Sequence, residues 1–191
     1  MTDWEQLWAA HDEDTYLAVL AQVGLDDVVL DIGAGDLRLT KRIAARAAHV
    51  YALERNPALL PPASDLPPNL AVLMGDAYQL PFPQGVTLSV LLLRHCRQFG
   101  RLLDKLVAVG CRRLVTNARW GLGVELMDLQ AVGQPYEAID LGWYACRCGA
   151  VGFVPGPSER LTAEVEEALT EVISCPTCRP ATASAGWRKR E

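Results

Sequence analysis

Short apolar runs that each end in an acidic residue dominate the first half of the chain. The runs and the residues that end them are 28–30 with Asp31, 50–53 with Glu54, and 70–74 with Gly75 and Asp76. Between the first two runs, residues 37–48 carry apolar side chains near helical spacing, which predicts an amphipathic helix. Because strands that alternate with helices form parallel sheets, we expect an α/β fold with a Rossmann-like, mostly parallel sheet flanked by helices.

The same alternation continues beyond the third run. The expected elements are strands at residues 86–93 and 113–116, and helices at residues 100–109, 121–132 and 158–172. At the start of the chain, residues 3–22 predict two helices interrupted near residues 11–14. Residues 56–69 contain five prolines, so any helix there should be short.

Two glycines follow the first strand, at the point where open α/β sheets bind ligands. Gly33 and Gly35 permit positive φ and close approach of a ligand to the backbone. Glu54 lies about twenty residues further on, where a Rossmann-like unit places a carboxylate that accepts hydrogen bonds from a ribose. A dinucleotide fingerprint needs a third glycine where this chain has Arg38, so we consider dinucleotide binding less fitting. An α/β protein whose glycine turn binds no ligand is the remaining alternative.

These motifs resemble those of class I S-adenosylmethionine-dependent methyltransferases. The three matching motifs are residues 30–36 (LDIGAGD), Glu54, and residues 75–77 (GDA). Within that superfamily, the stretches GDLRLTKRIA and VYALERNPALL are most similar to the rRNA adenine dimethylases, and the resemblance extends to about residue 120. It implies S-adenosylmethionine as cofactor, with Asp31, Gly33 and Gly35 beside its methionine part, Glu54 on the ribose hydroxyls, and Asp76 and Ala77 beside the adenine.

The loop after the fourth strand departs from that family. Adenine dimethylases carry an Asn or Asp, a Pro and an aromatic residue there, and those groups hold a planar amine; this chain has Arg94-His95-Cys96. His95 is the candidate catalytic base, because its unperturbed pKa is near neutrality. A His95 that only hydrogen bonds a neighbouring loop is an equally weighted alternative. We therefore predict a methyltransferase of unknown acceptor that is not an adenine-N6 dimethylase.

Four of the six cysteines fall in two clusters near the end of the chain. Cys146 and Cys148 sit at the tip of a predicted hairpin over residues 143–153, and Cys175 and Cys178 form a C-x-x-C pair. Four clustered cysteines favour a tetrahedral, structural Zn²⁺ in a zinc-ribbon-like element. Two disulfides or reduced thiols are the alternatives.

The composition and length of the chain also bear on its domain organisation and its cellular compartment. We expect a methyltransferase domain at residues 1–140, a zinc-binding element at 141–180 and a flexible tail at 181–191. The net charge of −5 and the absence of a long basic run argue against strong general binding of nucleic acid. No secretory signal or apolar span of membrane length is present, so we expect a cytoplasmic protein without membrane attachment.

Two classes of function remain open at this point. The first is an active methyltransferase whose acceptor is a small molecule, a protein or an RNA. The second is a non-catalytic module that binds S-adenosylmethionine and contacts a protein partner through its zinc knuckle. Fold alone does not separate them, and in either case the zinc element could brace the fold or contact the substrate.

Overall fold

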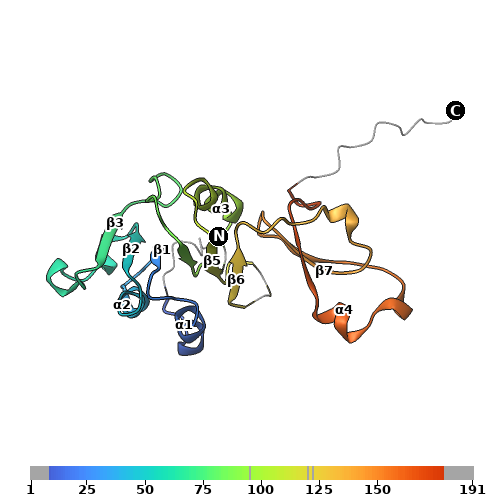
Figure 1. Ribbon diagram of the computed structural model, residues 1–191, viewed down its shortest axis with the longest axis horizontal. Helices are drawn as coiled ribbons and strands as arrows, with labels where there is room; N and C mark the ends of the chain where they lie inside the picture. Colours follow the sequence, from blue (N-terminus) through green and yellow to red (C-terminus); the bar gives the residue numbers. More distant parts are fainter. Residues whose placement is uncertain (1–8, 95, 120, 122, 179–191) are drawn as a thin grey trace. The chain divides into compact units, whose positions relative to one another are not determined.

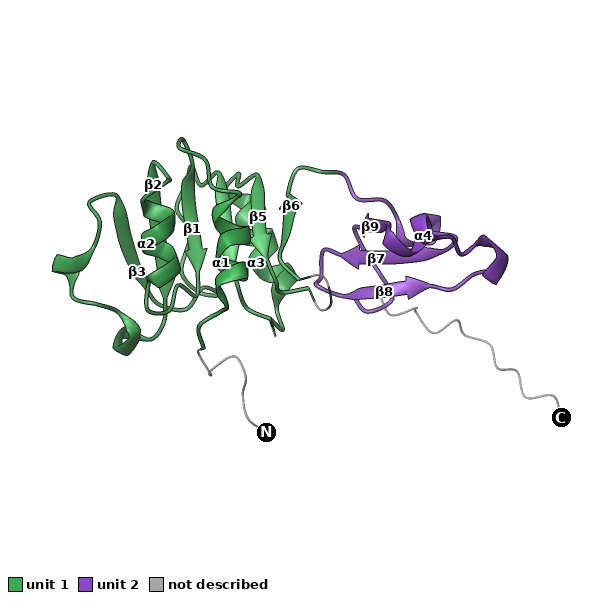
Figure 2. Cartoon of the chain, turned by 90° about the horizontal axis from the view of Figure 1, so that it is seen from below, with its two compact units in different colours: residues 1–131 green, residues 132–191 purple. Residues whose placement is uncertain are grey.

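The computed structural model describes residues 9–94, 96–119, 121 and 123–178. The chain divides into two compact units, residues 1–131 and 132–191, which are coloured separately in Figure 2. Within the described residues, no helix is long and apolar enough to cross a membrane. The predicted tail at residues 181–191 and the first part of the predicted N-terminal helices lie outside the described residues.

A mixed sheet forms the centre of the first unit (Figure 1). Its order is β3-β2-β1-β4-β5-β6; β3, β2, β1, β4 and β5 run parallel, and β6 runs antiparallel to β5. The strands are β1 (Val28–Ile32), β2 (His49–Glu54), β3 (Leu70–Met74), β4 (Leu88–Leu91), β5 (Arg113–Thr116) and β6 (Glu125–Asp128). The helices are α1 (Glu13–Leu20), α2 (Arg38–Ala44) and α3 (Phe99–Ala108), with 3-10 turns at Pro57–Leu59 and Ala63–Asp65. The predicted α/β class with a Rossmann-like, mostly parallel sheet is confirmed.

Apolar side chains cover both faces of this sheet, because successive strand residues point to opposite sides. One buried cluster joins strand residues such as Val29 and Val90 to side chains of α1 and α2. The other joins Leu30 and Leu91 to side chains of α3. Helices therefore pack on both faces, and the carboxyl ends of the parallel strands meet at one edge, where the acidic residues gather.

The helix predicted over residues 121–132 is wrong. Residues 125–128 form β6, in which Glu125 pairs with Thr116 of β5. Met127 is buried whereas its neighbour Leu126 is exposed, so the segment buries side chains with the period of a strand. Pairing with β5 is a contact that the local spacing of apolar residues does not contain, and it decides the conformation here.

The second unit is built on a smaller sheet of order β8-β7-β9. Its elements are β7 (Gly142–Cys146), β8 (Val151–Val154), α4 (Ala163–Glu167) and β9 (Leu169–Val172), with 3-10 turns at Tyr136–Ala138 and Ser158–Arg160. β7 and β8 form the predicted antiparallel hairpin. The helix predicted over residues 158–172 is only partly correct: its last residues form β9, because they pair in parallel with β7.

Candidate functional site

A cavity of about 790 Å³ opens at the carboxyl edge of the first unit's sheet. Its walls come from the ends of β1, β2, β3 and β4 and from the segment that precedes α1. This volume is within the range of cavities that hold small-molecule ligands and cofactors. All three acidic strand ends singled out from the sequence, Asp31, Glu54 and Asp76, line this one cavity.

The turn after β1 has a backbone conformation that restricts which residues it accepts. Gly33 and Gly35 have φ of 76° and 59°, and the N–H of Gly33 donates to the carbonyl of Leu53 at 2.8 Å. Leu37 also has positive φ, 63°, although it is not a glycine, and its side chain is fully buried. A left-handed conformation costs a residue with a Cβ roughly 1–2 kcal/mol. The backbone of Leu37 is therefore strained, and burial of its side chain offsets this cost.

Glu54 connects the end of β2 to the glycine turn. Its carboxylate accepts the N–H of Gly35 at 2.8 Å through Oε2 and the N–H of Asn56 at 2.8 Å through Oε1. The residue is 6% exposed and lines the cavity. Glu54 therefore orders the turn in addition to facing the space that a ligand would fill.

Asp31 is buried at the end of β1 and lines the same cavity. Its Oδ2 accepts the hydroxyl of Thr40 at 2.5 Å. Burial, with a smaller contribution from the nearby charge of Glu54, raises the pKa of Asp31 to about 6 against the opposing effect of the Thr40 hydrogen bond. Such a carboxylate is costly to ionise without a cationic partner, and a ligand ammonium group in the cavity would supply one.

Asp76 and Ala77 follow β3 and line the same cavity. Asp76 Oδ1 accepts the N–H of Tyr78 at 2.8 Å, which fixes the turn. The carbonyls of Ala77 and Leu80 accept hydrogen bonds from the ammonium of Lys105 on α3. This turn is thus held by a helix on one face of the sheet.

The segment before α1 contributes to the cavity wall. Residues 9–12 line the cavity. His11 Nε2 lies 3.2 Å from the carbonyl oxygen of Leu92, just after β4, and an Asp12 oxygen lies 3.8 Å from the Arg94 guanidinium. Tyr16 is buried and also lines the cavity. Periodicity carries no signal for such contacts, because they join segments about eighty residues apart.

The predicted base, His95, lies outside the described residues, and its role stays a prediction. The residues on either side of position 95 lie at the cavity. Arg94 lines the cavity, and Cys96 Sγ lies 3.5 Å from the hydroxyl of Tyr78, another lining residue. At the end of the adjacent strand β5, the buried Arg119 guanidinium forms an ion pair with Glu125. The side chain of Asn117 is buried there with no hydrogen-bond partner among the described residues.

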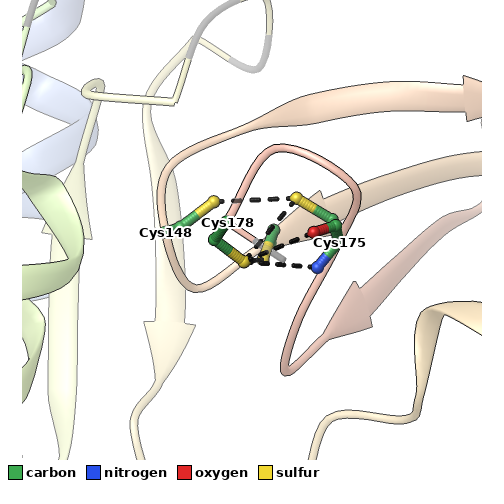
Figure 3. Close-up of side chains that lie close together, drawn as sticks. Cys148, Cys175 and Cys178 are labelled. Atoms are coloured by element: carbon green, nitrogen blue, oxygen red, sulfur yellow. Dashed lines mark hydrogen bonds between the residues drawn. The ribbon is translucent and has the colours of Figure 1, made fainter. Parts of the chain in front are cut away.

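The second unit brings its four clustered cysteines together, and Figure 3 labels three of them, Cys148, Cys175 and Cys178. All four sulfur atoms lie within 4.8 Å of one another. The separations are 3.7 Å for Cys148–Cys175, 3.8 Å for Cys146–Cys178 and 4.0 Å for Cys175–Cys178. Cys96 and Cys111 belong to the first unit and are not part of this group.

These distances match a tetrahedral metal site. Zn–S bonds of about 2.3 Å at tetrahedral angles imply sulfur separations of about 3.8 Å, whereas a disulfide needs about 2.05 Å. Burial raises the pKa of the Cys146 and Cys148 thiols, whereas hydrogen bonds from the backbone of Cys178 and Thr177 and from the other two thiols lower that of Cys175 to about 7 against the effect of burial. Four cysteine sulfurs at these separations could hold a metal ion.

Comparison with known proteins supports the reading of the first unit. Residues 12–103 match the family model described as ribosomal RNA adenine dimethylase. Two similar curated proteins bear the name "Probable ribosomal RNA small subunit methyltransferase A". The one from Methanosarcina acetivorans is 41% identical over 71 residues, 36% of this chain and 26% of that protein. The one from Pyrobaculum aerophilum is 37% identical over 70 residues, 36% of this chain and 30% of that protein. The chain thus spans less than a third of the length of these relatives.

Solved structures similar to the chain include a dimethyladenosine transferase from Plasmodium falciparum, with 21% identity, a TM-score of 0.45, and coverage of 54% of this chain and 39% of that one. Another is a precorrin 8w decarboxylase from Methanobacterium thermoautotrophicum, with 22% identity and a TM-score of 0.47. The match covers 58% of this chain and 64% of that one. The sheet order and the family match give the first unit the fold of the class I S-adenosylmethionine-dependent methyltransferases. Residues 12–103 are similar to the ribosomal RNA adenine dimethylase family.

Proposed function

We propose that the protein transfers a methyl group from S-adenosylmethionine to an acceptor. The observation that carries this proposal is the convergence of Asp31, Glu54 and Asp76 on one cavity, inside the segment that matches the family model. When bound, S-adenosylmethionine supplies an electrophilic methyl group on a sulfonium. The protein's part is to hold the reacting atoms in line and to exclude water.

Each cavity residue has a role that its surroundings support. Asp31, with its raised pKa, faces the ammonium of the methionine part, and the turn through Gly33 and Gly35 lets the backbone approach it. Glu54 accepts the ribose hydroxyls. Asp76 and Ala77 border the adenine on a turn that Lys105 holds in place.

The proposed acceptor is a group other than adenine N6. Arg94 and Cys96 occupy the loop after β4 where an adenine dimethylase carries an Asn or Asp, a Pro and an aromatic residue, so this loop lacks the groups that hold a planar amine. An oxygen, a thiol or a ring nitrogen needs only positioning and loss of a proton, for which His95 is the proposed base.

A structural zinc in the second unit is a separate part of the proposal. Cys146, Cys148, Cys175 and Cys178 would hold it, and the sulfur separations support this donor set. Four thiolates close the coordination sphere, so the metal would brace the hairpin and the end of β9 and would not activate a substrate.

Two measurements test the methyltransferase proposal. Calorimetry with S-adenosylhomocysteine should show one cofactor site per chain, and labelled S-adenosylmethionine should transfer label to one fraction of pooled cellular RNA, protein or metabolites. Absence of cofactor binding by the unmodified protein overturns the proposal. Methylation of adenine N6 in ribosomal RNA overturns only the statement about the acceptor.

A further inference from the structure

The small sheet of the second unit has two chemically different faces. Residues paired across neighbouring strands point to the same side. Trp143 of β7 pairs with Phe153 of β8 and with Leu169 of β9, so these three side chains share one face. Tyr144 and Cys146, which point the other way, share the opposite face with Val172.

The face with Tyr144 is the buried one. Tyr144, Cys146, Val172 and Cys175 form the unit's hydrophobic cluster, together with the thiols that would hold the metal. The ring of Tyr144 lies so close over Gly152 that a Cβ there would approach its hydroxyl to 2.6 Å. The core of the unit is therefore on this side, and the other face is not needed to enclose it.

The opposite face exposes large apolar side chains. Trp143 is 43% exposed and Leu169 is 40% exposed, and the ring of Trp143 stacks edge-to-face on that of Phe153 with 5.2 Å between centroids. We call these three residues the aromatic face. Exposed aromatic and aliphatic groups that adjoin on a rigid sheet are the kind of surface on which binding hot spots form.

Acidic residues predominate in residues 132–178, whereas residues 179–191 carry four basic residues and one acidic one. The part of the second unit that the structure describes, residues 132–178, has seven acidic and two basic residues, which gives 2 − 7 = −5. Glu171 of β9 lies on the same side of the sheet as Leu169, since both are spaced by two along the strand. One of the basic residues, Arg160, lies 3.7 Å from the carboxylate of Asp140. A metal held by four thiolates would add a further net negative charge.

We propose that the aromatic face docks a cationic protein segment, one that combines Lys or Arg residues with apolar side chains. The apolar side chains would cover Trp143, Phe153 and Leu169, and the cationic ones would meet the surrounding carboxylates. Acidic surroundings repel phosphates, so the same face disfavours RNA despite its exposed aromatic rings. The proposal concerns the second unit alone and does not depend on methyl transfer by the first.

The test uses the full chain and a short fluorescein-labelled peptide of alternating arginine and leucine, followed by fluorescence anisotropy. The peptide should bind, and its affinity should fall as salt is added. A matched peptide with glutamate in place of arginine should not bind. The variant Trp143→Gln should weaken binding by about tenfold or more. Leu169→Arg, which adds a like charge, provides a second and independent loss of affinity.

Val132→Gln is the matched control, because Val132 is an exposed apolar residue of the same unit, 97% exposed, outside its sheet. It should leave binding unchanged, and metal content and circular dichroism should be the same in all variants. Peptide binding that neither Trp143→Gln nor Leu169→Arg weakens overturns the proposal. Tighter binding of a single-stranded RNA than of the peptide also overturns it. The same holds if the unmodified protein self-associates and Trp143→Gln does not, or if the peptide binds only after removal of residues 179–191. These three outcomes would identify RNA, a second copy, or the chain's own basic terminus as the occupant.

Discussion

The carboxylate of Glu54 accepts a hydrogen bond from the backbone N–H of Gly35 at 2.8 Å. This contact joins two motifs that lie nineteen residues apart in the chain. Because the second oxygen of Glu54 holds the N–H of Asn56, one side chain fixes both the turn after β1 and the turn after β2. The residue proposed to bind ribose is therefore also the residue that shapes the cofactor turn.

Replacing Glu54 by Ala should weaken cofactor binding more than the loss of one ribose contact would. The change removes the acceptor for the hydroxyls and leaves the N–H of Gly35 without its partner, and each such loss costs about 1–3 kcal/mol. Calorimetry with S-adenosylhomocysteine measures the effect. The exposed Asp65, replaced by Asn, serves as a control that should bind normally. Unchanged affinity in Glu54→Ala would remove Glu54 from the cofactor site.

Asp31→Asn should stabilise the protein at neutral pH while weakening cofactor binding. The pKa of Asp31 is about 6 in the folded protein, above its ordinary value of 3.8, because the side chain is buried. The folded state therefore binds this proton more tightly than the unfolded state, so stability falls as pH rises from about 4 to about 6. The loss, roughly 1–3 kcal/mol, persists at pH 7. Asn cannot ionise and still accepts the Thr40 hydroxyl.

Denaturant unfolding across this pH range tests the claim. The free energy of unfolding of Asp31→Asn should fall less between pH 4 and pH 6 than that of the unmodified protein. At pH 7 it should be the higher of the two. Equal stability of the two proteins at every pH would show that Asp31 ionises normally in the folded state. Thr40→Val is a useful comparison, because it removes the hydroxyl and should raise the pKa of Asp31 further.

Substitutions at Leu37 should invert the usual order of Ala and Gly. Leu37 has φ of 63° and a fully buried side chain, so truncation to Ala removes about 2–5 kcal/mol of packing and keeps the strained backbone. Leu37→Gly loses the same packing but relieves roughly 1–2 kcal/mol of strain. Thermal unfolding should therefore find Leu37→Gly more stable than Leu37→Ala. The opposite order would mean that the backbone relaxes out of the left-handed region.

Cys175→Ser should abolish metal binding and loosen only the second unit. Metal analysis of the unmodified protein should give about one zinc per chain, as expected for a closed four-thiolate site. The variant should gain fast hydrogen exchange in β7, β8 and β9, while β1 to β5 stay protected, because the ligands all belong to residues 132–191. Cys96→Ser should keep the metal. Zinc retained at full occupancy in Cys175→Ser would refute the proposed ligand set.

His95→Ala should lower the methyl transfer rate by about a hundredfold or more, with cofactor affinity nearly unchanged, because general bases contribute rate factors of that size. The measurement compares single-turnover rates once an acceptor is known. His49→Ala provides the control, since His49 begins β2 at the end of the sheet away from the cavity. Equal rates in His95→Ala and the unmodified protein would exclude His95 as the base.

The sequence by itself determined the elements whose signals are local. The runs before Asp31, Glu54 and Asp76 form β1, β2 and β3, because buried parallel strands are continuously apolar. The turn at Gly33 and Gly35 follows from their freedom to adopt positive φ. The two cysteine pairs also carry their chemistry in their spacing, and the structure brings them within 4.8 Å.

Only the tertiary structure decided the features that depend on which segments meet. The sequence predicts helices over residues 121–132 and 158–172, yet residues 125–128 and 169–172 within them form strands, because they pair with β5 and β7. Contacts between distant segments also produce three features of the site. These are the hydrogen bond from Gly35 to Glu54, the place of residues 9–12 in the cavity wall, and the raised pKa of Asp31. Burial and strand pairing are set by contacts between distant residues, and no local pattern of side chains encodes them.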